Sequence, residues 1–174
     1  DGETLTLSRA ERVRIMGHIG SGKSTLVTLA LGLYDYPQGS ILLDGREVRS
    51  MSRGDIAKLI TFVPQGPKLL NRTILANLML GTNRSEEAVR CKIETLKRTL
   101  GDDLQFLELD KIAGKNGSKL STGQRAMVCL LRAMVNETPI IICDELTANL
   151  DHSMKQAVLN LLEIVSEGKL LIFI

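Results

Sequence analysis

The stretch from residue 17 to residue 25, Gly-His-Ile-Gly-Ser-Gly-Lys-Ser-Thr, constrains this chain more than any other. It contains a glycine, four further residues and then Gly-Lys-Ser, with an apolar run at 13–16 before it and another at 26–31 after it. A glycine-rich pattern in this setting predicts a strand, a loop that binds nucleotide phosphates and a helix. The alternative is an ordinary glycine-rich turn between a strand and a helix.

The residue types explain how such a loop would hold phosphate. Glycines let the backbone curl so that successive N–H groups point at one anion, and a helix that begins near Lys23 directs its positive end to the same place. Lys23 adds a charge for the β- and γ-phosphates, and Ser24 adds a hydroxyl for Mg²⁺. The residues expected to contact the nucleotide are Gly17, His18, Ile19, Gly20, Ser21, Gly22, Lys23, Ser24 and Thr25.

Composition places the chain among ordinary globular proteins. It has 174 residues, of which 44% are hydrophobic and 24% are charged, and its net charge is +2. This length favours one domain with a sizeable core. The charges are dispersed, so nothing in them argues for binding to nucleic acid. Cys91, Cys129 and Cys143 are too far apart for a disulfide or zinc framework and favour a reducing compartment.

The chain contains no apolar run near the roughly 20 residues that cross a bilayer. Its start does not resemble a signal peptide. It begins without Met and stops within an apolar run at 169–174, so we expect both ends to be cut from a longer protein. Any membrane-spanning segment would then belong to another chain or to a part outside this sequence.

Strands and helices alternate at both ends of the chain, while the middle is mostly helical. Strands are predicted at 5–7, 13–16, 40–43, 60–63, 140–143 and 169–174, and helices at 23–31, 52–59, 73–80, 85–100, 122–135 and 153–165, with a helical turn at 104–107. This order predicts one α/β domain over residues 1–174. Its nucleotide-binding core would comprise about 1–67 and 136–174, and an inserted helical subdomain about 68–135.

Two acids follow the apolar run at 140–143. A buried parallel strand delivers its last residues to the edge of the sheet where nucleotides bind. Asp144 would hold Mg²⁺ there, directly or through water, and Glu145 would orient or deprotonate the attacking water. Taken alone, two acids after a strand also fit a helix N-terminus or a solvated turn.

Residues 120–124, Leu-Ser-Thr-Gly-Gln, open the helix predicted at 122–135. Ser121 is a good N-cap, and small residues leave free N–H groups at the helix start, which would make a second anion site. Spacing alone cannot distinguish this from a simple capped helix.

Together these motifs resemble the ATP-binding cassette (ABC) ATPase domain of an ABC transporter, over essentially the whole chain. Residues 17–24 resemble Walker A, Gln65 the Q-loop glutamine, 120–124 the Leu-Ser-Gly-Gly-Gln signature, 144–145 Walker B with its catalytic glutamate, and 148–151 the D-loop. Five motifs in the right order are far more specific than any one of them. The resemblance implies a P-loop NTPase fold, a sheet sandwiched by helices with an inserted helical subdomain.

The resemblance also implies a mechanism. Two such domains, identical or not, would pair head to tail, with each ATP between Walker A of one and the signature of the other. It implies that catalysis involves Glu145, Lys23 and Gln65, that Mg²⁺ is held by Ser24, Gln65 and Asp144, and that the partner's ATP is contacted by Ser121, Thr122, Gly123 and Gln124. Asp151 would link the two sites. The cofactors would be ATP and Mg²⁺, and no nucleic acid is expected.

Two segments are similar to those of exporters. Residues 71–78 resemble a Thr-Ile-x-x-Asn-Leu segment, and residues 113–117 resemble the X-loop that precedes the signature. Both also fit an ordinary loop and capped helix. If the protein is an exporter, this domain would sit at the cytosolic face of a membrane, bound to transmembrane domains of the same or a separate chain.

The chain departs from the family pattern at several positions. Thr122 replaces the first signature glycine, and its Cβ would crowd the phosphate and could weaken one site of an asymmetric pair. Lys115 stands where exporters usually carry an acid, and Leu146 replaces the proline after Walker B. His18 and His152 are expected to be surface residues, and the family's switch histidine and adenine-stacking aromatic are not found.

Two other functions fit the same motifs. One is a soluble cassette ATPase that acts on ribosomes or nucleic acid, although the tandem cassettes, basic linker or coiled coil of such proteins are not visible. The other is a regulatory cassette that binds ATP with weak turnover, which the intact Lys23, Asp144 and Glu145 oppose and Thr122 leaves open.

Overall fold

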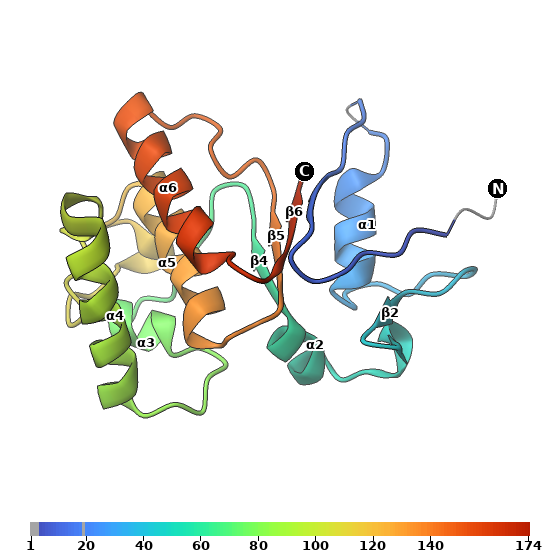
Figure 1. Ribbon diagram of the computed structural model, residues 1–174, viewed down its shortest axis with the longest axis horizontal. Helices are drawn as coiled ribbons and strands as arrows, with labels where there is room; N and C mark the ends of the chain where they lie inside the picture. Colours follow the sequence, from blue (N-terminus) through green and yellow to red (C-terminus); the bar gives the residue numbers. More distant parts are fainter. Residues whose placement is uncertain (1–3, 19) are drawn as a thin grey trace.

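A four-stranded parallel sheet forms the centre of the computed structural model, which describes residues 4–18 and 20–174 (Figure 1). Its strands lie in the order β1-β6-β5-β4, and their bounds are β1 (Arg12–Arg14), β4 (Ile60–Val63), β5 (Ile140–Cys143) and β6 (Leu170–Phe173). A separate antiparallel hairpin joins β2 (Leu42–Leu43) to β3 (Arg46–Glu47). Asp44 and Gly45 have φ angles of 47° and 74°, as the tight turn between these strands requires.

The predicted strands at 60–63 and 140–143 are confirmed to the residue, because continuous apolar runs suit strands buried on both faces. The strand predicted at 5–7 is wrong. Leu5 is 74% exposed and this segment joins neither sheet, so it has no ladder of hydrogen bonds. β1 is an edge strand rather than a buried one, with Arg12 and Arg14 exposed and Val13 half-buried.

Helices cover both faces of the sheet (Figure 1). α1 (Lys23–Ala30), α2 (Arg53–Leu59) and the hairpin enclose a smaller apolar cluster that includes Val27, Ile56 and Ile142. α5 (Thr122–Val135) and α6 (His152–Val165) cover the other face, where a larger cluster joins Ile141 and Leu171 of the sheet to Leu130 and other residues of the helices. Ser52 caps α2 as expected, accepting a hydrogen bond from Asp55 N at 3.1 Å.

The middle of the chain forms α3 (Ile74–Leu78), α4 (Glu86–Leu100) and short 3₁₀ turns at Val48–Ser50, Gly101–Leu104 and Lys115–Gly117. The helical turn expected at 104–107 therefore lies three residues earlier. α3 and α4 share one apolar cluster with α5, α6 and the sheet. The division into a core of about 1–67 and 136–174 and a helical subdomain of about 68–135 stays a prediction. None of the helices within 4–18 and 20–174 has the length and apolarity to cross a membrane.

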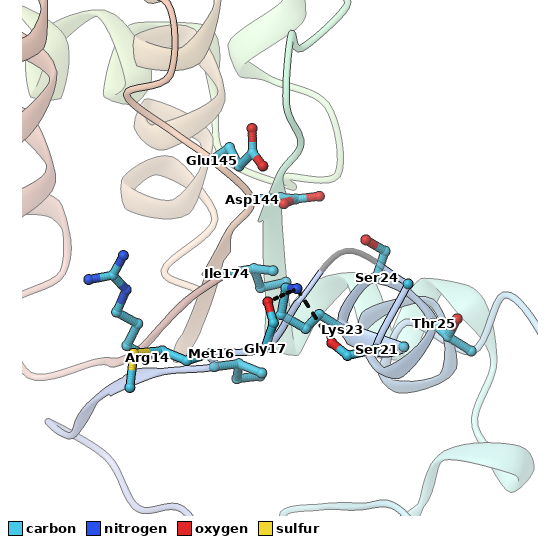
Figure 2. A pocket seen from close by; sticks show the side chains of 13 residues that line it. Arg14, Met16, Gly17, Ser21, Lys23, Ser24, Thr25, Asp144, Glu145 and Ile174 are labelled. Atoms are coloured by element: carbon cyan, nitrogen blue, oxygen red, sulfur yellow. Dashed lines mark hydrogen bonds between the residues drawn. The ribbon is translucent and has the colours of Figure 1, made fainter.

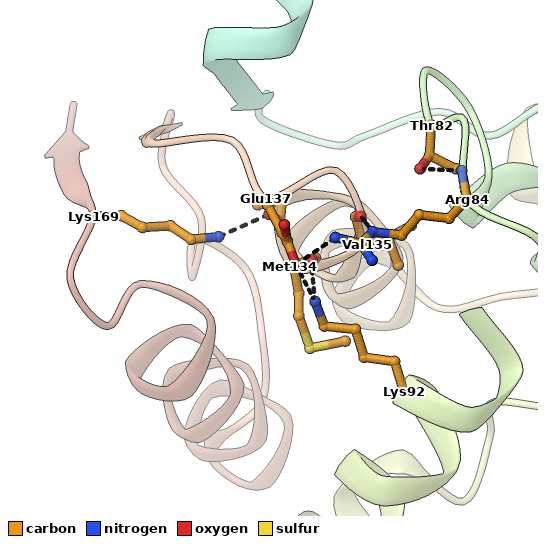
Figure 3. Close-up of polar contacts among 8 residues, drawn as sticks. Thr82, Arg84, Lys92, Met134, Val135, Glu137 and Lys169 are labelled. Carbon is orange, nitrogen blue, oxygen red and sulfur yellow. Dashed lines mark hydrogen bonds and ion pairs between the residues drawn. The ribbon is translucent and has the colours of Figure 1, made fainter. Parts of the chain in front are cut away.

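α5 is fixed at both ends. Ser121 and Gln124 form a capping box at its start. At its end, cations from three different segments donate to three successive carbonyls: Lys169 to Ala133 at 2.7 Å, Lys92 to Met134 at 3.0 Å and Arg84 to Val135 at 3.0 Å (Figure 3). Cations stabilise the negative end of a helix dipole. Burial and the neighbouring Lys92 lower the pKa of Lys169 to about 8.

Candidate active site

A cavity of about 590 Å³ lies at the carboxyl edge of the parallel sheet. Its walls come from the ends of β1, β5 and β6 and from the loop that leads into α1 (Figure 2). The lining residues are Arg14, Ile15, Met16, Gly17, Gly20, Ser21, Gly22, Lys23, Ser24, Thr25, Asp144, Glu145 and Ile174. The topology therefore gathers both halves of the predicted site, although some 120 positions of sequence separate them.

The glycine loop has the backbone that a phosphate cradle needs. Gly20 and Gly22 have φ angles of 84° and 91°, and an added Cβ at either would meet no atom within 4 Å, so the space beside them is open. Gly17 is needed for a different reason, because a Cβ there would lie 2.5 Å from Ser21 Oγ. Gly22 caps α1 without a side-chain hydrogen bond, and the first turn contains no acid, so the helix N–H groups face the cavity unneutralised.

Lys23 folds back over this loop (Figure 2). Its Nζ donates to the carbonyls of Gly17 at 2.6 Å and His18 at 3.0 Å, and lies 3.5 Å from Ser21 Oγ. These contacts hold the ammonium at the mouth of the loop, beside the cavity. His18 contributes its backbone here and does not line the cavity. Ile19 lies outside the described residues.

Asp144 and Glu145 form the opposite side of the cavity (Figure 2). Asp144 N donates to Val63 O at 2.9 Å, which extends the pairing of β5 with β4 by one residue. Burial raises the pKa of Asp144, the adjacent Glu145 charge raises it further, and Lys23 opposes the shift. A cation in the cavity would relieve this repulsion.

Glu145 has φ 45°, a left-handed conformation that is strained for a non-glycine residue. Its N–H donates to Ile174 O at 3.3 Å, and its carboxylate accepts a hydrogen bond from the Gln65 side-chain amide. Gln65 lies in the loop after β4, so three neighbouring strand ends contribute to the arrangement. Strain at such a position is common where a side chain serves a site.

The donor set fits a hard cation. The cavity offers Asp144 and Glu145 carboxylates and the Ser24 hydroxyl, and oxygen donors are those that Mg²⁺ prefers. Within 4–18 and 20–174 no group of three or more His, Cys, Asp or Glu side chains could hold a metal. Mg²⁺ usually keeps several waters and binds through one or two carboxylates and substrate phosphates, and these few protein oxygens suit that mode.

Residues 120–124 do not line this cavity. Ser121 Oγ accepts from Gln124 N at 3.1 Å and Ser121 N donates to Gln124 Oε1 at 2.9 Å, so the Gln124 side chain serves as a cap. Ser121 and Thr122 are exposed, while Gly123 is buried against Met154 of α6. Asp151 caps α6 by accepting from Met154 N at 2.9 Å. The start of α5, with residues 120–124, is thus separate from the cavity that the glycine loop lines.

The sequence reasoning missed Arg125, which directly follows the signature glutamine. It donates to the Pro67 carbonyl, two residues beyond Gln65, and to the Thr122 hydroxyl. The available signal was a cation in the first turns of a helix, where a positive charge is disfavoured.

Comparisons with known proteins agree with this geometry. The model of the ABC transporter family matches residues 1–148. The ATP-dependent lipid A-core flippase of Hahella chejuensis (strain KCTC 2396) is 36% identical over 172 residues, which covers 95% of this chain and 28% of the flippase. The ABC transporter ATM1 of Plasmodium falciparum (isolate 3D7) is 32% identical over 168 residues, covering 95% of this chain and 16% of that protein.

Among solved structures, a bacterial Atm1-family ABC exporter with ATP bound matches with a TM-score of 0.75 and 28% identity, over 95% of this chain and 29% of that chain. The chain thus spans less than a third of the length of these proteins. The predicted P-loop fold of an ABC ATPase is confirmed. Because the family model covers most of the sequence and the relatives cover 95% of it, the chain belongs to the ABC transporter family.

Proposed function

We propose that this chain is the ATP-binding and ATP-hydrolysing part of a membrane exporter. The observation that carries the proposal is the cavity that places Lys23 and the glycine loop opposite Asp144 and Glu145. The proteins named above are a flippase, an ABC transporter and an ABC exporter, which supports export over an action on ribosomes or nucleic acid.

The polar groups in and beside the cavity have chemical tasks in this proposal. The N–H groups of residues 17–25 and the start of α1 hold the phosphates, and Lys23 balances their charge. Ser24, Asp144 and Gln65 would hold Mg²⁺, which when bound neutralises charge on the β- and γ-phosphates. Glu145 takes a proton from the attacking water.

Gln65 has a second task, which its hydrogen bond to Glu145 suggests. The amide fixes the carboxylate of Glu145 at the edge of the cavity, where an attacking water would lie. Gln65, which is 80 positions from Glu145 in sequence, would thus change its position when the position of the Glu145 carboxylate changes.

The remaining part of the site would come from a second cassette. Residues 120–124 stand outside the cavity of their own chain, and the exposed Ser121 and Thr122 present the positive end of α5 to solvent. We propose that two copies pair head to tail, so that Ser121, Thr122, Gly123 and Gln124 of one copy cover the ATP of the other. The γ-phosphate then favours the closed pair by contacts that the open form does not make.

The transported substrate and the membrane domains lie beyond this chain. We propose that the domain sits at the cytosolic face and drives transmembrane domains in the same or a separate chain. This part of the proposal rests on the relatives, of which the chain covers 16% to 29%.

The test is Glu145→Gln in the full-length protein. We expect ATP turnover to fall by at least about 100-fold, because general-base catalysis contributes roughly that much or more. ATP binding and ATP-dependent closure of the two cassettes should persist, since the phosphate cradle is unchanged. Lys23→Ala is the matched control and should lose ATP binding itself. Unchanged hydrolysis by the Glu145→Gln protein would show that this carboxylate is not the base.

A further inference from the structure

Thr122 stands where the ABC signature has a glycine, and its side chain has a partner within its own chain. The Thr122 hydroxyl accepts a hydrogen bond from Arg125 Nη2 at 3.0 Å. A glycine could not make this contact. The hydroxyl is therefore directed back to the helix that it starts.

Arg125 carries two further hydrogen bonds from the same planar group. Its Nε donates to Pro67 O at 2.8 Å, and its Nη1 donates to Leu120 O at 2.7 Å. Pro67 is buried and lies in the loop that carries Gln65, whereas Leu120 and Thr122 flank the N-cap of α5. One guanidinium thus joins the start of α5 to a loop 58 residues earlier in the chain, with the fork geometry that a lysine lacks.

Packing and charge also single out this arginine. An added Cβ at Gly117 would lie 2.5 Å from Arg125 Cδ, so the segment before the signature leaves room for the side chain. No ion pair of the described residues includes Arg125. A cation near a helix N-terminus is disfavoured by the dipole, so its position depends on the three acceptors.

We propose that Thr122 is a positioning residue: its hydroxyl and the Pro67 carbonyl together fix Arg125, and Arg125 sets the orientation of residues 120–124 relative to the loop of Gln65. This inference rests on the proposed function, in which Gln65 serves the chain's own ATP and residues 120–124 serve the partner's. The replacement of glycine by threonine thus adds a link between the two ATP sites.

The test uses the full-length protein with Glu145→Gln, so that ATP closes the cassettes without being consumed. Closure is followed by fluorescence energy transfer between dyes on α4 of the two subunits. Nucleotide binding by the open form is followed with ADP, by displacement of a fluorescent ADP analogue. Thr122→Val removes the hydroxyl at nearly constant shape. Thr122→Ser, which keeps it, is the matched control.

We expect Thr122→Val to raise the ATP concentration for half-closure roughly threefold to tenfold, the effect of losing one ordinary hydrogen bond at an exposed position. Affinity for ADP, which lacks the γ-phosphate that favours closure, should stay unchanged, and Thr122→Ser should close normally. In an Arg125→Gln background, Thr122→Val should have no further effect, because the acceptor has lost its donor.

Equal closure by the valine and serine variants would overturn the inference, as would a loss of ADP affinity in the valine variant or full additivity with Arg125→Gln. If the parent with Glu145→Gln does not close with ATP, the proposed function itself fails. Closure of the Glu145→Gln parent protein therefore distinguishes a failure of the proposed function from a failure of the inference about Thr122.

Discussion

Gly123→Ala should destabilise the protein for a reason that is visible in the packing of α5 on α6. A Cβ at Gly123 would lie 2.5 Å from Sδ of Met154, closer still to its Cγ, and 3.5 Å from Leu150 Cδ2. The Cγ is near the start of the side chain, so rotation of the sulfur end does not make room. Met154 must therefore change its χ1 rotamer, or the start of α6, which Asp151 caps through Met154 N, must shift.

The magnitude follows from two opposing effects. Overpacking a well-filled site costs about 1–3 kcal/mol, and the short distance to Cγ places this case in the upper half of that range. Alanine in place of glycine in a helix returns about 0.5–1 kcal/mol. We therefore expect a net loss of about 1–2.5 kcal/mol in the free energy of unfolding, or a fall in Tm of roughly 2–10 °C for a domain of this size.

Urea and thermal unfolding of four proteins test this reasoning: the parent, Gly123→Ala, Met154→Ala and the double variant. In the Met154→Ala background the overpacking is relieved, so the alanine at 123 should stabilise the protein by about 0.5–1 kcal/mol. The coupling between the two positions is then the overpacking cost itself, about 2–3 kcal/mol. A Gly123→Ala protein as stable as the parent would refute the packing argument. So would an equal loss in both backgrounds, because the cost would then not arise from Met154.

Two further predictions concern groups inside the fold. Asn77→Ala should lower the free energy of unfolding by about 2–4 kcal/mol, because it leaves buried partners unsatisfied; Asn77 is 0% exposed, accepts from Leu70 N at 2.9 Å and donates to the carbonyls of Leu70 and Thr73 at 3.0 Å each. The comparison is Asn160→Ala, which removes an amide nearer the surface. An Asn77→Ala protein whose urea midpoint falls less than that of Asn160→Ala would contradict this prediction. Burial raises the pKa of Cys143 from 9.0 to about 12, so the folded protein keeps a proton that the unfolded chain loses. The contribution of this thiol to the free energy of unfolding should therefore be fully present below pH 9 and be lost as the pH rises toward 12, by at most about 1.4 kcal/mol per pH unit. Cys143→Ala should reduce the dependence of unfolding on pH in this alkaline range. An unchanged dependence would show that other groups cause it.

Where local signals and tertiary contacts agreed, the sequence was enough to predict the fold. α5 begins and ends where predicted, because Ser121 and Gln124 cap it and an apolar face follows at helical spacing. β5 was predicted to the residue because its three isoleucines and Cys143 suit a strand with neighbours on both sides. The segment at 5–7 alternates like a strand but pairs with neither sheet. Periodicity records which side chains are apolar and not which edge is available.

Part of the candidate site could likewise be predicted from the sequence, and part could not. Asp144 and Glu145 could be placed opposite Lys23 in advance, since parallel strands end at one edge of a sheet. The capping role of Gln124 and the bonds of Arg125 could not. The signature pattern suggests that each of its residues contacts a nucleotide. In the structure, the Gln124 side chain instead accepts a hydrogen bond from Ser121 N of its own helix, and sequence alone does not say which of these partners it binds. The Pro67 carbonyl is 58 residues from Arg125 and becomes its acceptor only through the fold.

The two ends of α5 differ in how they are held, and this bears on how the signature could move. The C-terminal carbonyls are held by cations from three segments, and the middle of the helix is fully buried, with Met127 and Leu130 at 0% exposure. A helix anchored over this length turns as a unit with the elements packed on it. The start of α5 is held to the loop of Gln65 by Arg125 and to α6 by Gly123 and Met154. A movement of Gln65 on binding ATP would therefore reach residues 120–124 through side chains at the tip, which is where the Thr122 and Gly123 variants act.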